Sequence, residues 1–574
     1  MKRLAIASLL AACAATPRPF PLRALVVRDT DLASVSLPCR ADPTPKEPDR
    51  ETCAPVEYVS PFVWDQVDNI LFGRIARGLS VDLPGEAVNV NSLDEVPDSA
   101  WFTNRPRGPA THADDAPPGA CTAADMLAPQ DQVADGAWVI DHGKDNGASL
   151  GFRISVPGKG IYMLKADDAN DPELASAASA IGAAFYDALG FHTTCEQIVV
   201  VRRAQLSLAP GLTVSTNSGS KRPFDEKSLD AVLAASTQVP GHLVRLQASK
   251  WLPGLTLGPF HYAGVRPDDP NDAIDHRDRR ELRGSKLVAA WMNHWDAREQ
   301  NSMDVWMADD PKHKRASPGH VLHYILDTSD AFGALGGPEA LAVMQGFAYY
   351  LDAPAIFRSL FTFGFDERPW ERVHRTPGHE RFNFFSVADF DPAEWKPSYP
   401  NPAFLAMSER DGAWMARLIA RFSPADIRRL VDHGKFSTPG DAAWLTEVMV
   451  GRQRRILEHY LMNLSPLGDI RSVGADQICA TDFARLREVV PAPAFHYAIV
   501  ERAAGREIAL RPELGEDGAV CFHTQPLVGG AHPDGDAAQR VTIVVTNGTR
   551  AGALVIHTYD LGTRGMRVAG VDRP

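Results

Sequence analysis

The sequence predicts an α+β protein in which a β-rich segment, a helical segment and a second β-rich segment follow one another. Three observations predict this order. Residues 136–262 hold short apolar runs between glycine-bearing turns, residues 263–465 hold apolar side chains at helical spacing, and residues 466–574 return to alternating, β-branched runs. We therefore expect a two-lobed arrangement, with a β-rich N-lobe and a helical C-lobe, followed by a C-terminal β-sandwich-like domain.

Composition excludes some classes of protein. The chain has 574 residues, which is too long for one ordinary core. Its 44% hydrophobic and 23% charged residues are typical of a globular protein. The formal net charge of −13 argues against nucleic acid as a partner, because nucleic-acid binding depends on a basic surface.

The N-terminus has the pattern of an export signal. Met1-Lys2-Arg3 is basic, Leu4–Ala12 is short and apolar, and Leu10-Ala11-Ala12-Cys13 resembles the bacterial lipobox. That resemblance implies that residues 1–13 are a lipoprotein signal peptide and that Cys13 is lipidated. A plain signal peptide cut nearby is the alternative. We expect a protein of the bacterial cell envelope, in the periplasm or at the outer membrane, held to the membrane only through the lipid anchor.

Six cysteines follow Cys13, an even number that suits disulfides in an exported chain. Proximity in the sequence favours the pairs Cys39–Cys53 and Cys479–Cys521. The cysteines form no CxxC pair and no tight cluster with histidine, so a structural zinc site is not expected.

Residues 14–135 are predicted to be an N-terminal extension and tether, since much of this region is rich in Pro, Asp and Gly with little periodicity. Asp94–Arg105, which contains Trp101-Phe102, stands out within it. This segment is either a lid over a site or a loop pinned by a buried Trp-Phe pair, and we favour the second interpretation.

A glycine-bearing turn and a hairpin open the first β-rich segment. Gly147 and Gly151 lie just before strands predicted at Phe152–Val156 and Ile161–Lys165, which flank Pro157–Gly160. Such a turn can lay backbone N–H groups over nucleotide phosphates, although an ordinary hairpin has the same pattern.

Lys165 ends the second strand of this hairpin, and a helix follows it. Asp171 is expected to cap that helix, Pro172 to take its first position and Gly190 to end it. In phosphoryl-transfer enzymes, a strand lysine binds phosphate and a helix carboxylate holds the lysine, a role that Glu173 would fill. The alternative is a solvated lysine and a glutamate that merely favours the helix start.

The stretch around His294 carries the most specific motif. His294-x-Asp296-x4-Asn301 has the spacing of the protein-kinase catalytic loop and resembles it. The resemblance implies that Asp296 is the catalytic base, that Asn301 binds a divalent cation, and that Arg298 lies near the transferred phosphate.

A second acidic motif follows a strand predicted at Val321–Leu326. Asp327 ends this strand, and oxygen ligands of this kind suit Mg²⁺ or Mn²⁺. The run Asp327–Gly333 resembles the Asp-Phe-Gly-x-x-Phe-Gly run of phosphoinositide and HipA-type kinases. Thr328 and Ser329 replace Phe-Gly, so the metal ligand is kept while the aromatic switch residue is lost. Asp330 is a second ligand candidate.

Together, residues 137–461 resemble the atypical protein-kinase-like superfamily. The resemblance implies transfer of phosphate from ATP, with Mg²⁺ or Mn²⁺, to an unknown acceptor: a protein, a glycan or a small molecule. A catalytically inactive, pseudokinase-like scaffold of the envelope is the alternative. The chain also resembles a group of bacterial proteins that share the Asp94–Arg105 segment and the Trp-x-x-His-x-Asp loop, and that resemblance implies no substrate.

The remaining periodicity predicts further helices and strands. Helices are expected at 338–351, 354–360, 403–422, 424–434 and 441–461, with an irregular aromatic stretch at 370–402. The C-terminal β domain is expected to serve packing or partner binding.

Overall fold

The structure is a computed structural model, and the described residues form an α+β protein, as predicted. The first 19 residues, with Cys13, lie outside the described residues, and so do Cys39, Cys53 and Gly147. Two compact units are present: Leu461–Pro574 with Val90–Glu95 and Met1–Arg28, and Asp29–Asn89 with Val96–Tyr460. The structure describes residues 20, 29, 31–36, 40–41, 51–52, 67–79, 85–105, 120–144, 149–167, 171–215, 221–315, 317–334, 342–525 and 538–574.

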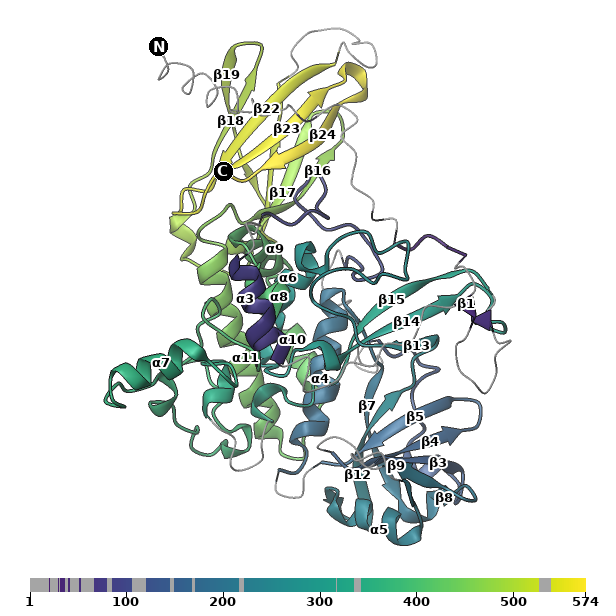
Figure 1. Ribbon diagram of the computed structural model, residues 1–574. Helices are drawn as coiled ribbons and strands as arrows, with labels where there is room; N and C mark the ends of the chain where they lie inside the picture. Colours follow the sequence, from purple (N-terminus) through teal and green to yellow (C-terminus); the bar gives the residue numbers. More distant parts are fainter. Residues whose placement is uncertain are drawn as a thin grey trace. The chain divides into compact units, whose positions relative to one another are not determined.

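The β-rich part of the larger unit is a seven-stranded sheet (Figure 1). The strands run in the order β11-β12-β5-β4-β3-β8, and β7 also pairs with β12. All these pairs are antiparallel except β3 with β8. The strands are β3 Trp138–Lys144, β4 Gly151–Val156, β5 Gly160–Lys165, β7 Glu196–Arg202, β8 Leu206–Leu208, β11 Gln238–Val239 and β12 Leu243–Lys250.

The predicted hairpin is the centre of this sheet. β4 and β5 pair from Gly151↔Lys165 to Val156↔Gly160, so the turn lies where the sequence predicts it. Alternate side chains of the two strands, including Phe152, Ile154 and Leu164, lie in one apolar cluster. This alternation fixes the register, because a slip of one residue would turn the apolar set toward water.

A helix packs against β7 and β12 of this sheet, and a second sheet begins with β6 just after that helix. α4 (Leu174–Leu189) is buried over most of its length and ends at Gly190, whose φ of 112° places it in the left-handed region that glycine tolerates. A four-stranded sheet has the order β13-β14-β15-β6. Its strands are β6 His192–Thr193, β13 Leu255–Gly258, β14 Ser302–Ala308 and β15 Gly319–Ile325.

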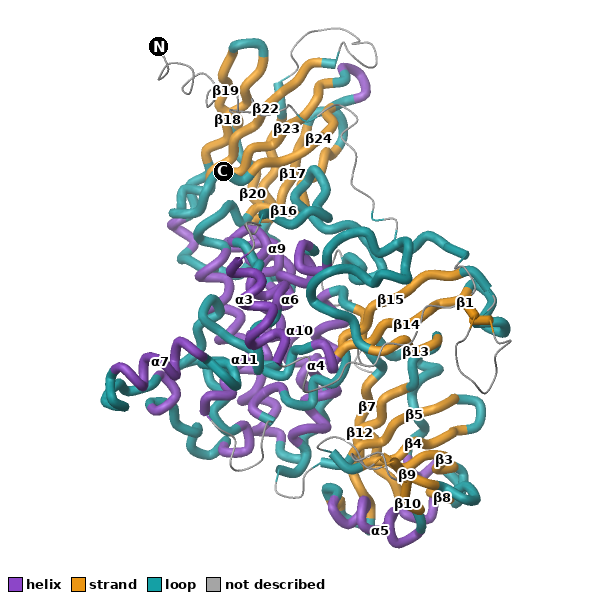
Figure 2. The backbone as a smooth tube through the Cα atoms, in the orientation of Figure 1, coloured by secondary structure: helices purple, strands orange, loops and turns teal. Residues whose placement is uncertain are grey.

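Helices are the main regular elements in the second half of the larger unit, where long loops connect them (Figure 2). Among the described residues, no helix is both long enough and apolar enough to cross a bilayer. The helices of the larger unit besides α4 are α3 Gly73–Leu79, α5 Glu226–Ala235, α6 Arg280–Met292, α7 Ala353–Phe361, α8 Pro402–Leu405, α9 Glu409–Ile419, α10 Pro424–Asp432 and α11 Pro439–Tyr460, and its short strands are β1 Arg40–Ala41, β2 Glu51–Thr52, β9 Thr213–Ser215 and β10 Lys221–Pro223.

Two local predictions are wrong. In the described part of 338–351, Ala342–Gln345 forms only a short 3₁₀ turn. The helix after Lys165 begins at Leu174, with Glu173 as its N-cap at a φ of 70°, so Asp171 does not cap it. Arg381 and the backbone N–H of Ser437 bind the Glu173 carboxylate instead, and these tertiary contacts override the local capping signal.

The N-terminal extension is partly built into the larger unit rather than being only a tether. Trp101 and Phe102 are buried, which confirms the interpretation of a pinned loop. Trp101 stacks on His323, with ring centroids 3.5 Å apart, and Phe102 packs edge-on against Trp414. The extension therefore covers β15 and the helical region at once.

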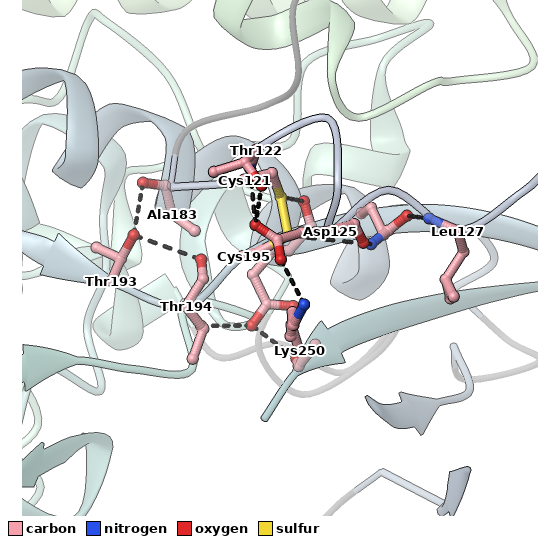
Figure 3. The surroundings of a disulfide bond; sticks show 12 residues. Cys121, Thr122, Asp125, Leu127, Ala183, Thr193, Thr194, Cys195 and Lys250 are labelled. Carbon is pink, nitrogen blue, oxygen red and sulfur yellow. Dashed lines mark hydrogen bonds and ion pairs between the residues drawn. A yellow bond between two sulfur atoms is a disulfide. The ribbon is translucent and has the colours of Figure 1, made fainter. Parts of the chain in front are cut away.

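A disulfide fastens a second part of the extension. Cys121 bonds to Cys195, immediately before β7, and the Lys250 ammonium pairs with Asp125 beside it (Figure 3). The backbone N–H of Lys250 donates to the Cys195 carbonyl at 2.9 Å. Residues 121–125 are therefore tied to the ends of both β7 and β12.

The smaller unit contains two antiparallel sheets that share one apolar core. One has the order β16-β17-β21-β20 and the other β19-β18-β22-β23-β24. Cys479 and Cys521 face each other on β17 and β21 and form the predicted disulfide, which is confirmed. The elements are β16 Leu467–Val473, β17 Gln477–Asp482, α12 Phe483–Leu486, β18 Ala498–Ala503, β19 Arg506–Leu510, β20 Glu513–Leu514, β21 Ala519–His523, β22 Gln539–Thr546, β23 Leu554–Asp560 and β24 Met566–Asp572.

We expect the double substitution Cys121→Ser/Cys195→Ser to lower the free energy of unfolding by roughly 2–4 kcal/mol, because the bond closes a long loop in the unfolded chain. The two cysteines are 74 residues apart. Denaturant unfolding of the two proteins measures the difference. Equal stabilities would show that residues 121–125 are held by their non-covalent contacts alone.

Candidate functional site

The site is built around an ion pair between Lys165 and Asp327. Lys165 is the last residue of β5, and Asp327 follows the end of β15. The Lys165 Nζ lies 3.0 Å from Asp327 Oδ2, although the two residues are 162 positions apart. The Ser329 hydroxyl donates to the other carboxylate oxygen at 2.6 Å. The structure therefore brings together the predicted phosphate-binding lysine and the predicted metal-binding aspartate.

Both partners of this pair are held in their charged forms. Burial alone would lower the pKa of Lys165, but Asp327 and Glu196 outweigh it and raise that pKa. Burial likewise opposes ionisation of Asp327, but the Lys165 ammonium and Ser329 hold its pKa well below the usual range. The Asp327 side chain is 39% exposed, so it remains open to a ligand from solvent.

Glu173 is not the carboxylate that accompanies Lys165. Its Oε2 accepts from Arg381 at 2.8 Å and from the backbone N–H of Ser437 at 3.1 Å. Within the described residues, no hydrogen bond or ion pair joins Glu173 to Lys165. Glu173 instead connects the start of α4 to the helical region. The prediction that its carboxylate pairs with Lys165 is therefore wrong.

Glu196, at the start of β7, is the second carboxylate that acts on Lys165. It is buried, and its two oxygens accept from Thr194, Gln247 and Ser249. Gln247 pairs with Lys165 across β12 and β5, which places this network next to the lysine in the sheet. Sequence reasoning missed Glu196, because only the strand order brings β7 and β5 to either side of β12.

The motif from His294 to Asn301 leaves α6 through a fixed turn. Asn293 ends the helix with a φ of 55°, a conformation that asparagine tolerates better than most residues. The buried Arg452 guanidinium of α11 donates to the carbonyls of Ala290 and Trp291 at 2.6 and 2.9 Å. The end of α6 is therefore clamped, and the motif starts from a rigid base.

Asp296, Arg298 and Asn301 contact one another. Arg298 lies 2.8 Å from Asp296 Oδ2, and the Asn301 amide donates to the carbonyl and the carboxylate of Asp296 at 2.8 and 3.2 Å. The backbone N–H of Asp296 donates to Asp330 Oδ2 at 2.8 Å. Asp330 thus positions the loop, a role that the sequence did not indicate.

Two carboxyl groups of the site have raised pKa values. Burial raises the pKa of Asp296 to about 6, and Asp330 adds to this effect. Burial and the nearby Asp327 raise the pKa of Asp330 to about 7. Clustered acids with shifted pKa values are typical of functional sites. Asp296 therefore exchanges its proton close to neutral pH.

His294 lies behind the acidic cluster, where it links α4 to Asp330. Its Nδ1 lies 3.0 Å from the Tyr186 hydroxyl, and its Nε2 lies 3.4 Å from Asp330 Oδ1. Burial lowers the pKa of His294 to about 4, so the ring is neutral at pH 7. It positions neighbouring groups rather than carrying charge.

Thr328 connects the Asp327 segment to α4. Its hydroxyl lies 3.3 and 3.2 Å from the carbonyl oxygens of Ala178 and Ser179. A Cβ added to Gly182 would lie 2.4 Å from the Thr328 hydroxyl oxygen, so only glycine fits at that point of the helix. Asp327 itself has a φ of 45°. The helix contact holds this uncommon backbone conformation, which aims the carboxylate at Lys165.

Gly151 is needed for strand pairing. It begins β4 opposite Lys165, and an added Cβ would lie 2.2 Å from the Leu164 carbonyl oxygen. The role predicted for Gly151 in a nucleotide loop stays a prediction. Gly147, the other glycine predicted for that loop, lies outside the described residues.

The side chains of the site supply too few ligands to bind a divalent cation alone, so a substrate must supply the others. In the described part of the chain, no group of three His, Cys, Asp or Glu side chains is placed to hold a metal ion. Mg²⁺ commonly takes one or two protein carboxylates together with substrate phosphates. Asp330 raises the pKa of Asp296 and Asp327 raises the pKa of Asp330, in addition to the effect of burial, and a bound cation would relieve this repulsion. Asn301 and Asp327 suit such a cation as oxygen donors.

A cavity of about 450 Å³ lies away from these groups. It is bordered by Lys250–Pro253, by His192 and Thr193 of β6, and by Tyr324 of β15, close to the Cys121–Cys195 disulfide. Lys165, Asp296 and Asp327 do not line it. The charged cluster and this cavity are therefore separate features.

Comparison with protein-family models, curated proteins and solved structures finds no match to this chain.

We expect the Asp330 carboxyl to contribute stability to the larger unit that is lost as the pH rises from about 4 to about 7, measured in the presence of a chelator. Asp330 binds its proton more tightly when folded than when unfolded, because its folded pKa of about 7 lies above the usual value of 3.8. At this carboxyl the folded state holds more proton in that window, so the contribution of Asp330 to stability falls with pH. The buried His294, whose pKa is lowered to about 4, acts in the opposite direction. Asp330→Asn should flatten the dependence of the melting temperature on pH, and an unchanged slope would remove Asp330 as its source.

Proposed function

We propose that the chain is an exported, lipid-anchored atypical kinase that transfers phosphate from ATP to an acceptor hydroxyl with Mg²⁺ or Mn²⁺. The observation that carries this proposal is the 3.0 Å contact between Lys165 and Asp327, two residues that sequence motifs had separately assigned to phosphate and metal. The acceptor is a protein, a glycan or a small molecule of the envelope.

The order of the elements supports a two-lobed kinase-like arrangement. An antiparallel hairpin with a terminal lysine is followed by a helix, by paired strands β7 and β12, by the α6 helix with its His294–Asn301 motif, and by the β14–β15 hairpin that delivers Asp327. In kinases the lysine, the catalytic loop and the metal-binding aspartate come in this order along the chain. Each residue is carried by the type of element that this function requires.

The site residues have distinct roles in the proposed reaction. Lys165 binds the phosphates of ATP by charge, which its raised pKa secures. Asp296 accepts the proton of the acceptor hydroxyl as the new bond to phosphorus forms and ADP leaves. A base with a pKa of about 6 suits this step near neutral pH. Arg298, held against Asp296, supplies positive charge beside the transferred group.

A divalent cation, when bound, neutralises charge on the phosphates. Asn301 and Asp327 would hold it through their side-chain oxygens, and Asp330 keeps the loop that carries Asp296 in place. Lys165 and Asp327 are already paired, so phosphate and cation would insert between groups of opposite sign. Such insertion requires the Lys165 and Asp327 side chains, which are now 3.0 Å apart, to separate.

The proposed location follows from the disulfides and the N-terminus. The two disulfides of the described residues are typical of an extracytoplasmic protein. The predicted lipid on Cys13 would hold the chain at a membrane of the bacterial envelope.

A catalytically inactive scaffold is the alternative function. An ion pair between Lys165 and Asp327 also stabilises a protein that binds no nucleotide, so this contact alone does not separate the two functions. Export favours the scaffold, since ATP is scarce outside the cytoplasm. Nucleotide binding separates the two functions.

ATP with Mg²⁺ or Mn²⁺ is expected to raise the melting temperature of the intact chain. Ligand at about 100 times its Kd adds about 2.7 kcal/mol to stability. Asp327→Asn should abolish this shift, because it removes the charge that holds the cation. Differential scanning fluorimetry measures it, and the absence of any shift with ATP and either metal would favour the scaffold.

Glu196 and Glu173 provide a matched pair of variants for that assay. Glu196→Gln removes a charge that acts on Lys165, so it should weaken the ATP-dependent shift. Glu173→Gln removes a carboxylate bound to Arg381 and should leave the shift unchanged. The opposite result would restore Glu173 as the functional partner of the lysine.

Transfer of labelled phosphate tests catalysis itself. The intact chain should move radiolabelled phosphate from ATP to an envelope extract or to itself, and Asp296→Asn should reduce the rate by about 10²–10⁴-fold, the usual contribution of a general base. The variant should keep the ATP-dependent thermal shift. Transfer that survives Asp296→Asn would exclude Asp296 as the base.

A further inference from the structure

The segment 350–365 exposes an unusual set of large apolar side chains. α7 contains no buried residue and lies at the edge of the helical part of the larger unit (Figure 1). Phe361, Phe363 and Phe365 are 77%, 88% and 92% exposed, and Ile356, Phe357 and Leu360 are each more than half exposed. We call these six side chains the apolar tip. Contiguous exposed apolar groups of this kind mark interaction sites.

The apolar tip is rigidly presented. Asp352 caps α7 through the backbone N–H of Ala355 and also pairs with Lys396 at 2.9 Å. After the helix, the N–H of Gly364 donates to the Ser359 carbonyl at 2.8 Å, and Arg358 pairs with Asp366 at 2.5 Å. The phenylalanines are therefore held outward by a closed helix and turn.

The charge around the apolar tip is balanced, unlike the charge of the whole chain. Residues 350–375 contain four arginines and four acidic residues, whereas the chain carries a formal net charge of −13. An anionic lipid surface would repel most of the protein but would not repel this segment. Charge repulsion therefore does not oppose contact between the tip and an anionic bilayer.

We propose that the apolar tip inserts into the surface of a lipid bilayer. α7 has nine residues and a length of about 14 Å, too short for a hydrocarbon core of about 30 Å, so the tip enters one face only. Short helices with exposed Phe and Leu lie about 5–10 Å deep at the head-group boundary. The choice of lipid as occupant rests on the proposed acylation of Cys13, which would keep the chain beside a bilayer.

A second membrane contact would strengthen the attachment that the proposed lipid on Cys13 provides. One acyl chain binds membranes only marginally, and stable attachment takes two signals. The apolar tip supplies the second signal from a part of the chain remote in sequence from Cys13. It also fixes the larger unit against the bilayer rather than leaving it free on a tether.

Vesicle flotation tests the proposal. The chain made without residues 1–13, and so without lipid, is mixed with vesicles of phosphatidylethanolamine and phosphatidylglycerol. We expect it to float with the vesicles, and we expect the triple variant Phe361→Ser/Phe363→Ser/Phe365→Ser to bind at least about tenfold more weakly, because apolar burial drives insertion. The matched control Leu405→Ser/Val473→Ser/Leu514→Ser, which removes three other exposed apolar side chains, should bind like the parent.

A depth measurement complements flotation. A bimane label on Phe363→Cys should be quenched by spin-labelled lipid, relative to the parent chain labelled in parallel. No flotation, or equal flotation of the parent and the phenylalanine triple variant, overturns the proposal. Self-association without vesicles that this triple variant abolishes also overturns it and identifies a second copy as the occupant. The ATP-dependent thermal shift is measured without lipid, so failure here is distinct from failure of the kinase proposal.

Discussion

The contact between Lys165 and Asp327 is the constraint on which the rest of the site depends. It joins the last residue of a sheet strand to a segment that follows a different sheet, and neither charge is fully solvated. Removing one partner of such a pair would leave the other charge poorly compensated, which costs several kcal/mol in buried cases. The seven-stranded sheet, α4 and β15 must therefore be placed together for either charge to be tolerated.

Other parts of the larger unit serve this placement. Arg452 holds the end of α6, Asp330 holds the loop that follows, and Thr328 fixes the segment of Asp327 against α4. Each of these contacts is made by a buried polar group whose hydrogen bonds go to backbone atoms. Such bonds depend little on which side chain the partner residue carries. They hold the backbone around Asp296 and Asp327 in place although the carboxylates of the site repel one another.

The sequence predicted those parts of the fold that depend on interactions between residues close together in the chain. The Pro157–Gly160 turn with its flanking alternation predicted β4 and β5, and Gly190 predicted the end of α4. Proximity predicted Cys479–Cys521, since these cysteines lie on paired strands. The helix predicted at 338–351 is not formed in its described part, because apolar spacing alone does not distinguish a helix from a loop that packs its side chains.

The candidate site was predicted in its order but not in all its partners. Motif spacing singled out Lys165, Asp296, Asn301 and Asp327, and the structure places Lys165 against Asp327 and Asn301 against Asp296. Glu196 was missed because its position depends on the order of β5, β12 and β7, and Cys121–Cys195 was missed because its halves are 74 residues apart. Glu173 was assigned to the lysine because a helix with an acidic residue follows the strand that carries Lys165. A distant arginine, Arg381, binds its carboxylate instead.

The close fit of Gly182 against Thr328 links two positions that are far apart in the chain. A methyl group at 182 would push α4 away from the strand end, and the shift would move Asp327 with it. Substitutions at these positions are consequently coupled: any enlargement of residue 182 needs a smaller neighbour at 328. Because residue 182 has no side chain, α4 lies close to Thr328, and this close approach keeps Asp327 beside Lys165.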